Sequence, residues 1–160
     1  MLENPPANMP RISPYLYYED VAAALAWLSR AFGLRERMRM PGPDGNVAHA
    51  EMELAEGVVM MGRPGPDYRN PKRLGQATQS LYVYVDEVDK HFRRAVEAGA
   101  TIVQEPTDQF YGDRNYAVDD PEGHRWYFAE HVREMTPEDM KKAIRPAEPA
   151  PPGAAHGIVP

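Results

Sequence analysis

The segment Ser13-Pro14-Tyr15-Leu16-Tyr17-Tyr18-Glu19-Asp20 returns later in the chain as Ser80-Leu81-Tyr82-Val83-Tyr84-Val85-Asp86-Glu87. In each copy two sets of side chains alternate along a predicted strand, and the copy ends in acidic residues that favour a helix start. Each is followed by a segment with apolar residues at helical spacing, which ends at Gly33 in the first copy and at Gly99 in the second. This duplication predicts two similar modules that share an interface, and such an interface is a frequent place for a ligand.

The repeat sets the expected domain organisation. Residues 11–62 and 79–132 are each predicted to form a module with the order β-α-β-β-β. In the first module Asp20 is expected to cap a helix that ends near Phe32, and in the second the helix is expected to begin at Asp86 or Glu87. Outside the modules we expect a disordered N-terminus (1–10), a linker or loop over a cleft (63–78), a short helix (133–144) and a flexible tail (145–160).

Composition excludes several classes of function. The net charge of −6 disfavours a nucleic-acid partner, which requires a basic face. No segment approaches the roughly 20 apolar residues that span a bilayer, and the first ten residues lack the pattern of a secretory signal. The chain has no cysteine, and therefore no disulfide, thiolate metal site or cysteine nucleophile. We expect a cytoplasmic protein that binds neither nucleic acid nor membrane.

Three stretches carry a family resemblance: Tyr111-Gly112-Asp113-Arg114-Asn115-Tyr116 with Asp119-Asp120-Pro121-Glu122-Gly123-His124-Arg125-Trp126, then His49-Ala50-Glu51-Met52-Glu53-Leu54 with Gly57-Val58-Val59-Met60-Met61, and the tail from His131 to Met140. They resemble the glyoxalase/bleomycin-resistance-like subgroup of the vicinal oxygen chelate superfamily. The resemblance implies an α+β fold in which two tandem β-α-β-β-β modules form a curved mixed sheet around a cleft. The motifs say little about the substrate, because this fold hosts many chemistries.

Alternation along the strands assigns side chains to the two sides of each sheet. Ile12, Pro14 and Leu16 are expected under the helices, as are Leu81, Val83 and Val85 in the second copy. Ser13, Tyr15 and Tyr17 are expected to face the cleft together with Ser80, Tyr82 and Tyr84. On the last strand, Trp126 and Phe128 are assigned to the helix side, and Tyr127 to the cleft. His91 is expected to be exposed on a helix, and His124 to brace the turn that contains it.

The resemblance also implies where a metal would bind. Metal-dependent members hold a divalent ion with His or Glu from the first and fourth strands of each module. The matching positions here are Ser13, Ser80, Met60 or Met61, and Tyr127, and none supplies an imidazole or a carboxylate. We therefore expect no metal and no other cofactor. A displaced site built from His49, Glu51 and Glu53, with Glu130 and His131, stays open as an alternative.

The tyrosine-rich cleft favours a protein that binds a small molecule without reacting with it. Aromatic rings with phenolic groups stack on flat molecules, and methionine adds an adaptable contact. By resemblance to the bleomycin-resistance members, we expect sequestration of a planar aromatic drug or natural product at the junction of a homodimer. The negative net charge, with Glu51, Glu53 and Asp113, favours a cationic ligand. The expected ligand contacts are Ser13, Tyr15, Tyr17, Met60, Met61, Ser80, Tyr82, Tyr84, Arg114, Tyr116 and Tyr127.

Three alternatives remain. In the first, the chain is a metal-free isomerase, cyclase or lyase in which His49 and Glu51 form the catalytic base pair and tyrosines stabilise an enolate. In the second, it is a metal-dependent lyase or dioxygenase with relocated ligands. In the third, the protein fills its cleft with its own side chains, since alternating tyrosine also suits half-buried strands.

Overall fold

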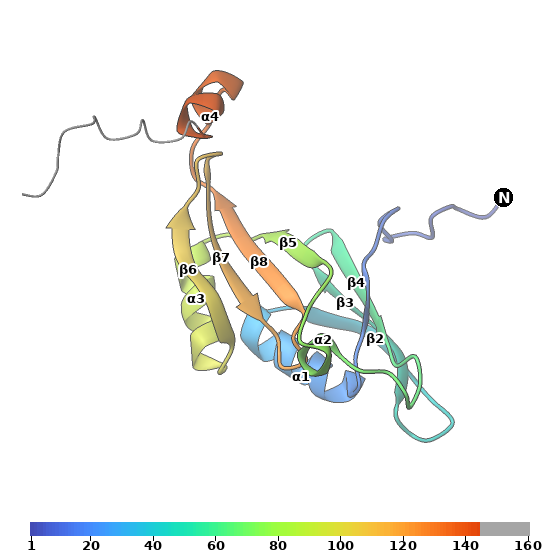
Figure 1. Ribbon diagram of the computed structural model, residues 1–160. Helices are drawn as coiled ribbons and strands as arrows, with labels where there is room; N and C mark the ends of the chain where they lie inside the picture. Colours follow the sequence, from blue (N-terminus) through green and yellow to red (C-terminus); the bar gives the residue numbers. More distant parts are fainter. Residues whose placement is uncertain (145–160) are drawn as a thin grey trace, which may run out of the picture.

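The chain folds into two four-stranded sheets, each with one helix on one side. A computed structural model describes residues 1–144, so the tail expected over 145–160 lies outside the described residues. Figure 1 shows the strands of the first module on the right and those of the second on the left, with α1 at the bottom where the two meet. The elements are β1 (Tyr15–Tyr17), α1 (Val21–Phe32), β2 (Arg35–Pro41), β3 (Val47–Leu54), β4 (Gly57–Gly62), α2 (Pro71–Leu74), β5 (Ser80–Tyr84), α3 (Val88–Glu97), β6 (Thr101–Asp108), β7 (Asp113–Asp119), β8 (Arg125–His131) and α4 (Pro137–Ile144).

The two sheets have the same topology. Their strand orders are β1-β4-β3-β2 and β5-β8-β7-β6, with the first strand parallel to the last and the other pairs antiparallel. The predicted β-α-β-β-β order is thereby confirmed in both modules. In each module the first strand lies at an edge of its sheet, and its outer side has no strand partner within the described residues.

Local sequence explains where the helices begin and end. The Asp20 carboxylate accepts a hydrogen bond from Ala23 N, and Gly33 ends α1 with a φ of 76° in the left-handed region. The cap of α3 is Glu87, one of the two predicted residues. The four-residue helix α2 was not predicted; Asn70 caps it inside the linker.

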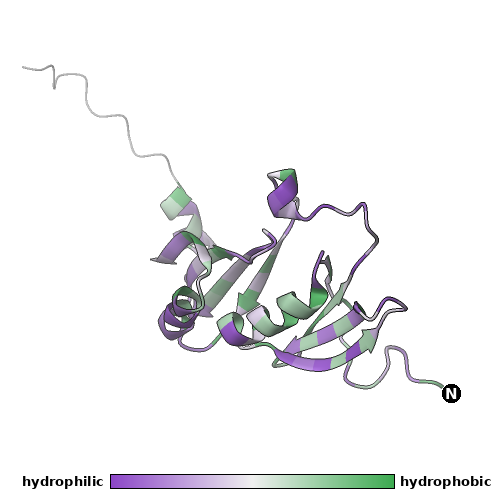
Figure 2. Cartoon of the chain, turned by 90° about the horizontal axis from the view of Figure 1, so that it is seen from below, coloured by the Kyte–Doolittle hydropathy of each residue, from purple (hydrophilic) through white to green (hydrophobic). Residues whose placement is uncertain are grey.

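Alternation correctly predicts most of the core. Leu16, Trp126 and Phe128 are buried under the helices as expected. Figure 2 shows the alternation as hydrophilic and hydrophobic bands along the strands. Ile12 is an exception, because its side chain is 88% exposed. It lies before β1, which begins only at Tyr15, so the rule for strand faces does not apply to it.

The turn between β7 and β8 fastens the two modules together. Tyr18 donates a 2.7 Å hydrogen bond from its hydroxyl to Asp120, and the Glu122 carboxylate accepts from the backbone N–H groups of Glu19 and Asp20. His124 braces the turn as predicted, since its N–H donates to Asp120 and its Nε2 lies 2.8 Å from the carbonyl oxygen of Tyr17. The Asp-Pro-x-Gly-His motif is therefore a structural joint between modules.

Helices α1 and α3 pack against each other and partly bury His91, which corrects the expectation that His91 is exposed. Its Nε2 donates to the carbonyl oxygen of Phe32 at 2.9 Å, so its Nδ1 accepts from the Tyr116 hydroxyl at 2.7 Å. Burial lowers the pKa of His91 below its usual value. Within residues 1–144, no helix is long and apolar enough to cross a membrane.

Candidate functional site: the open faces of the two sheets

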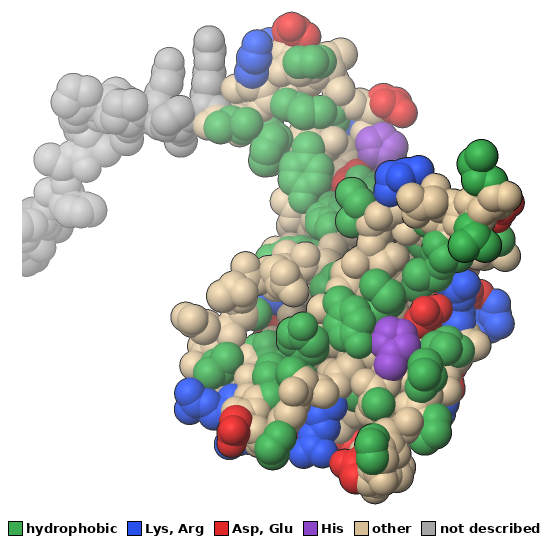
Figure 3. Space-filling model, turned by 90° about the vertical axis from the view of Figure 1, so that its right-hand side faces the viewer, with side chains coloured by type: hydrophobic (Ala, Val, Ile, Leu, Met, Phe, Trp, Pro, Cys, Tyr) green, Lys and Arg blue, Asp and Glu red, His purple; other side chains and the backbone are tan. Residues whose placement is uncertain are grey.

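The predicted cleft tyrosines lie on the side of each sheet that faces away from its helix. We call these two surfaces the N-terminal open face (Tyr15, Tyr17, His49, Glu51 and Met60) and the C-terminal open face (Tyr82, Tyr84, Asp113, Asn115 and Tyr127). Tyr15 and Tyr17 are 39% and 48% exposed, and Tyr82 and Tyr84 are 43% and 61% exposed. Figure 3 shows hydrophobic side chains following one another across one side of the molecule, from α4 downward. Such exposed aromatic surface is typical of a binding site.

On the N-terminal open face, a tyrosine contacts a histidine. The Tyr15 hydroxyl lies 2.8 Å from Nδ1 of His49, and the other ring nitrogen of His49 lies 3.7 Å from the Glu51 carboxylate. Burial, and then the neighbouring Tyr17, raise the pKa of Tyr15. The structure therefore brings the predicted pair His49 and Glu51 together and adds Tyr15 to it.

The acidic residues of this face are balanced by arginine. Arg37 lies 3.8 Å from Glu51 and 3.1 Å from Glu53, and Arg35 also pairs with Glu53. These two carboxylates therefore add little net negative charge to the face, although the sequence suggested that they would attract a cation.

Two residues that the sequence did not single out shape this face. Gly62 of β4 leaves room for Tyr15, because a Cβ at that position would lie 2.5 Å from the Tyr15 hydroxyl. Tyr68, from the linker, donates a 2.8 Å hydrogen bond to the carbonyl oxygen of Tyr17 and packs edge-on against the Tyr17 ring. The sequence signal for the space beside Tyr15 was a glycine at a position that alternation assigns to the open face.

On the C-terminal open face, Asp113 organises the tyrosines. Asp113 is 3% exposed, and its carboxylate accepts hydrogen bonds from the hydroxyls of Tyr82 and Tyr84, at 2.8 and 2.9 Å, and from Nδ1 of His131, at 2.8 Å. Burial works to raise the pKa of Asp113, but these three donors outweigh it and lower that pKa. The hydrogen bond to Asp113 raises the pKa of His131, with Glu134 adding to it.

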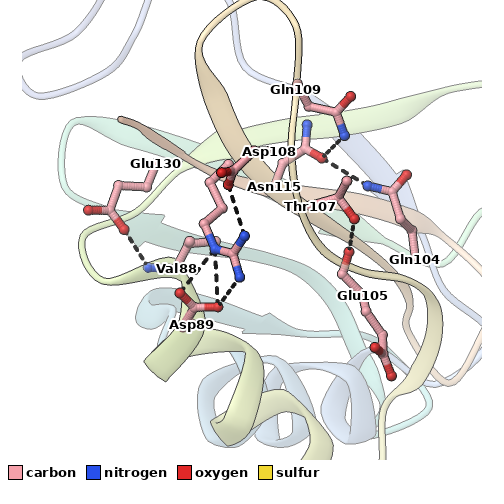
Figure 4. A network of polar contacts seen from close by, with 10 residues as sticks. Val88, Asp89, Gln104, Glu105, Thr107, Asp108, Gln109, Asn115 and Glu130 are labelled. Atoms are coloured by element: carbon pink, nitrogen blue, oxygen red, sulfur yellow. Dashed lines mark hydrogen bonds and ion pairs between the residues drawn. The ribbon is translucent and has the colours of Figure 1, made fainter. Parts of the chain in front are cut away.

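Asn115 fixes the second contact of Tyr82. Its oxygen accepts from the side-chain amides of Gln104 and Gln109 at 3.1 and 3.0 Å (Figure 4), so its amide nitrogen points toward the hydroxyls of Tyr82 and Tyr111, at 3.1 and 2.9 Å. Burial, ahead of the neighbouring hydrogen bonds, raises the pKa of Tyr82. The rings of Tyr82 and Tyr127 are stacked, with centroids 6.1 Å apart. The sequence did not single out Asn115, and it offered His131 only as a ligand of the displaced metal site.

Three predicted ligand contacts lie on the helix side instead. Met61 and Tyr116 are fully buried, and the Tyr116 hydroxyl is bonded to His91. Arg114 pairs with Asp89 of α3 and with Asp108 (Figure 4). The reason is the two-residue period of a strand, which puts Met60, Asp113 and Asn115 on the open faces and turns their neighbours inward.

The positions where the superfamily holds a metal do not suit one here. The Ser13 hydroxyl is buried and has no hydrogen-bond partner among residues 1–144. Ser80 is exposed at the start of β5, and Met60 and Tyr127 contribute a thioether and a phenol. Hydroxyl, thioether and phenol groups are a poor ligand set for a divalent ion. Within residues 1–144, no three His, Cys, Asp or Glu side chains are grouped so that they could hold a metal.

The displaced metal site is not assembled within the described chain either. His49 and Glu51 belong to the first sheet, whereas His131 belongs to the second. The Glu130 carboxylate is on the helix side, where it accepts from Val88 N at the start of α3 (Figure 4).

The two open faces do not share one cavity within the described residues. The groove between the modules, about 600 Å³ in volume, lies along the free edge of β5. Tyr82 and Tyr84 line it, but Tyr15 and Tyr17 do not, and the rest of its wall is mainly apolar, including Leu34, Leu54, Val58, Leu81, Val83 and Trp126. The expected single cleft with tyrosines from both modules is therefore not formed within residues 1–144 of one chain.

The fold and motifs define the class of protein. The chain belongs to the glyoxalase/bleomycin resistance protein/dioxygenase superfamily, whose family model matches residues 9–128. It is similar to an uncharacterized protein of Mycobacterium bovis, with 36% identity over 140 residues that cover 84% of this chain and 92% of the relative. Among solved structures it is similar to TioX from Micromonospora sp. ML1, with 39% identity, a TM-score of 0.64, and coverage of 76% of this chain and 98% of TioX.

A more distant likeness supports the fold alone. The fosfomycin resistance protein FosX from Listeria monocytogenes is 15% identical, with a TM-score of 0.57 and coverage of 82% of this chain and 98% of FosX. The superfamily name covers both enzymes and resistance proteins, so membership leaves the activity of this chain to be argued from its own residues.

Proposed function

We propose that this protein binds and sequesters a planar aromatic compound, as a drug- or natural-product-resistance protein of the cytoplasm. The observation that carries the proposal is the repetition of exposed tyrosine pairs on both open faces, Tyr15 with Tyr17 and Tyr82 with Tyr84. Their rings are held by neighbours, which lowers the entropy lost when a flat molecule stacks on them. Serine, methionine and tyrosine at the inherited metal positions support binding without metal-assisted chemistry.

The proposal includes a homodimer that completes the site. β1 and β5 are both edge strands and occupy equivalent positions in the repeat. A two-fold axis that sets β1 of one copy beside β5 of the other makes two identical junctions, each with one N-terminal and one C-terminal open face. Each junction then encloses four tyrosines around one flat molecule, and the apolar groove along β5 gains a partner.

The direct test is mass spectrometry of small molecules that copurify with the protein from its native host. We expect a planar aromatic compound, recovered unchanged, at up to one molecule per junction. Replacing Tyr82 by Ala should weaken binding, and with it the recovered amount, about fivefold or more, because stacking on an aromatic side chain contributes about 1 kcal/mol or more. Tyr116→Phe is a control, since within residues 1–144 the only hydrogen-bond partner of its buried hydroxyl is His91. Equal recovery with Tyr82→Ala would contradict the proposal.

A specific contact favours a second candidate, a metal-free enzyme that transfers a proton. The 2.8 Å contact between the Tyr15 hydroxyl and His49, with Glu51 behind it, is an arrangement that can accept or donate a proton at an exposed aromatic surface. Such an enzyme would isomerise, cyclise or eliminate. Under this candidate, His49→Ala abolishes conversion of the copurified compound and leaves its binding intact. Recovery of unaltered compound from wild-type protein after prolonged incubation excludes it.

A further inference from the structure

We infer that the C-terminal open face takes a positively charged aromatic or methylated ammonium group of the bound molecule. The inference rests on the proposed function, because it assigns the ligand class for one half of that site. It depends on how Asp113 is placed, rather than on the net charge of the chain.

The first argument is the charge balance of the two open faces. The carboxylates of the N-terminal open face are paired with Arg35 and Arg37, and Arg125 on the C-terminal side is paired with Asp119. Asp113 differs, because within residues 1–144 the only basic side chain in contact with its carboxylate is that of His131. The negative charge that lacks an arginine therefore lies under Tyr82 and Tyr84.

The second argument is the direction of the hydrogen bonds. Tyr82 and Tyr84 both donate their hydroxyl protons to the Asp113 carboxylate. Their oxygens can then only accept, and the Tyr82 oxygen already accepts from Asn115. An anion approaching these two oxygens finds lone pairs and no donor. A cation, or a group with N–H donors, is complementary to them.

The third argument concerns the rings. A phenol that donates to a carboxylate carries more electron density in its ring, which strengthens the attraction of the ring face for a cation. Three tyrosine rings, from Tyr82, Tyr84 and Tyr127, lie next to one another, with centroids 5.6 and 6.1 Å apart. The Asp113 side chain is buried and its carboxylate already accepts three hydrogen bonds, so the ligand contacts the rings and Asp113 acts through them.

The test compares two probes of the same shape and different charge, 2-methylisoquinolinium and 2-methylnaphthalene, by calorimetric titration of the full chain. We expect the cation to bind about tenfold more tightly than the neutral probe. Tyr84→Leu should remove most of this preference. Its matched control is Tyr17→Leu, the equivalent position of the first module, which should retain it. Both side chains are largely exposed, so both variants are expected to fold.

The outcomes separate the inference from the proposed function. Equal affinity for the two probes, or tighter binding of the neutral one, overturns the inference and leaves the proposed function standing. Failure of both probes to bind at millimolar concentration contradicts the proposed function itself. Loss of the preference in Tyr17→Leu but not in Tyr84→Leu also overturns the inference, because it puts the cation on the other face. As a second variant, Asp113→Asn should lose the preference if circular dichroism shows that it is folded.

Discussion

The two open faces share a framework and differ in chemistry. Tyr15 and Tyr82 occupy equivalent places, opposite Met60 and Tyr127, and Tyr17 and Tyr84 lie opposite Gly62 and Ala129. The first tyrosine of each pair contacts an equivalent residue two strands away in its sheet, His49 of β3 in one module and Asn115 of β7 in the other. The duplication therefore retained the rings and changed their hydrogen-bond partners.

This difference gives the faces different capabilities. Tyr15 contacts an imidazole, whose ring nitrogens can accept and donate a proton. Tyr82 and Tyr84 are tied to a buried carboxylate and present acceptors only. The N-terminal open face is thus suited to a group that gains or loses a proton, and the C-terminal open face to a permanent cation.

The largest predicted effect is the removal of Asp113. Asp113→Ala leaves Tyr82, Tyr84 and His131 without their shared acceptor, and breaking such a buried charged network costs about 3 kcal/mol. The comparison is with Glu51→Ala, whose ion pairs are partly exposed and worth about 1 kcal/mol or less. Urea unfolding measures both. Equal losses of unfolding free energy in Asp113→Ala and Glu51→Ala would contradict the difference described between the hydrogen bonds of Asp113 and the ion pairs of Glu51.

The next effect in size is Gly62→Ala. The added Cβ would overlap the Tyr15 hydroxyl, so the ring must move and the contact with His49 is lost. We expect a loss of about 1–3 kcal/mol in unfolding free energy, and weaker binding of both probes with the preference for the cation unchanged. The matched change in the second module is Ala129→Gly, which should leave the C-terminal tyrosines in place. A lost preference in Gly62→Ala would show that the faces are not independent.

A smaller effect is the pH dependence of cation binding. The pKa of His131 is raised by Asp113, so the proton on His131 leaves only above the usual value of 6.5. Below that pH, protonated His131 balances Asp113. As the pH rises through the raised pKa, this balance is lost and binding of 2-methylisoquinolinium should strengthen, while that of 2-methylnaphthalene should not change. Glu134, 3.5 Å from His131, adds a further negative charge. His131→Ala should remove the dependence.

The same shifts have a consequence for stability. The pKa of His131 is raised on folding, so its contribution is present below pH 6.5 and is lost as the pH rises through the folded value. The pKa of Asp113 is lowered, so its contribution is present above 3.8 and is lost as the pH falls through the folded value. We therefore expect His131 and Asp113 together to stabilise the fold most between about pH 3.8 and pH 6.5. A melting-temperature profile that is identical in wild type and His131→Ala would contradict this.

The smallest effect is Tyr15→Phe. It removes a hydroxyl whose partner, His49, is partly exposed and can bond to water instead, so binding of both probes should change by less than about 1 kcal/mol. Tyr82→Phe is the counterpart. It should lose more unfolding free energy than Tyr15→Phe, because it leaves Asp113 and Asn115 each without one hydrogen-bond partner in a buried setting. The midpoints of urea unfolding rank the two. A larger loss in Tyr15→Phe would reverse the ranking and contradict the comparison.

The sequence predicted the scaffold because that information is local. A period of two assigns Tyr15, Leu16 and Tyr17 to opposite sides of a strand regardless of distant contacts, and Asp20 and Gly33 mark the ends of a helix by themselves. Tyr116 and Arg114 were named as ligand contacts without this rule being applied to their strand, and the structure puts both on the helix side. Both residues are held on the helix side by α3, through His91 and Asp89.

The arrangement of the modules was not available from local pattern. A repeat predicts two similar sheets, but packing decides whether their open faces meet within one chain. Here Phe32, at the end of α1, packs on Trp126 and Phe128 of the second sheet, and the Asp120 turn holds the start of α1. These contacts join residues far apart in sequence, and they leave the two tyrosine pairs on separate faces.

The most direct test of the central claim is a titration with 2-methylisoquinolinium, followed by nuclear magnetic resonance, of protein labelled on its tyrosine rings and on its leucine methyl groups. If the open faces hold flat molecules, the ring signals of Tyr82 and Tyr84 shift first and furthest, those of Tyr15 and Tyr17 follow, and that of the buried Tyr116 stays in place. The account would be contradicted if the titration left the ring signals of all four exposed tyrosines unchanged. It would also be contradicted if the only shifts were in methyl groups of the apolar groove, such as those of Leu34 and Leu54.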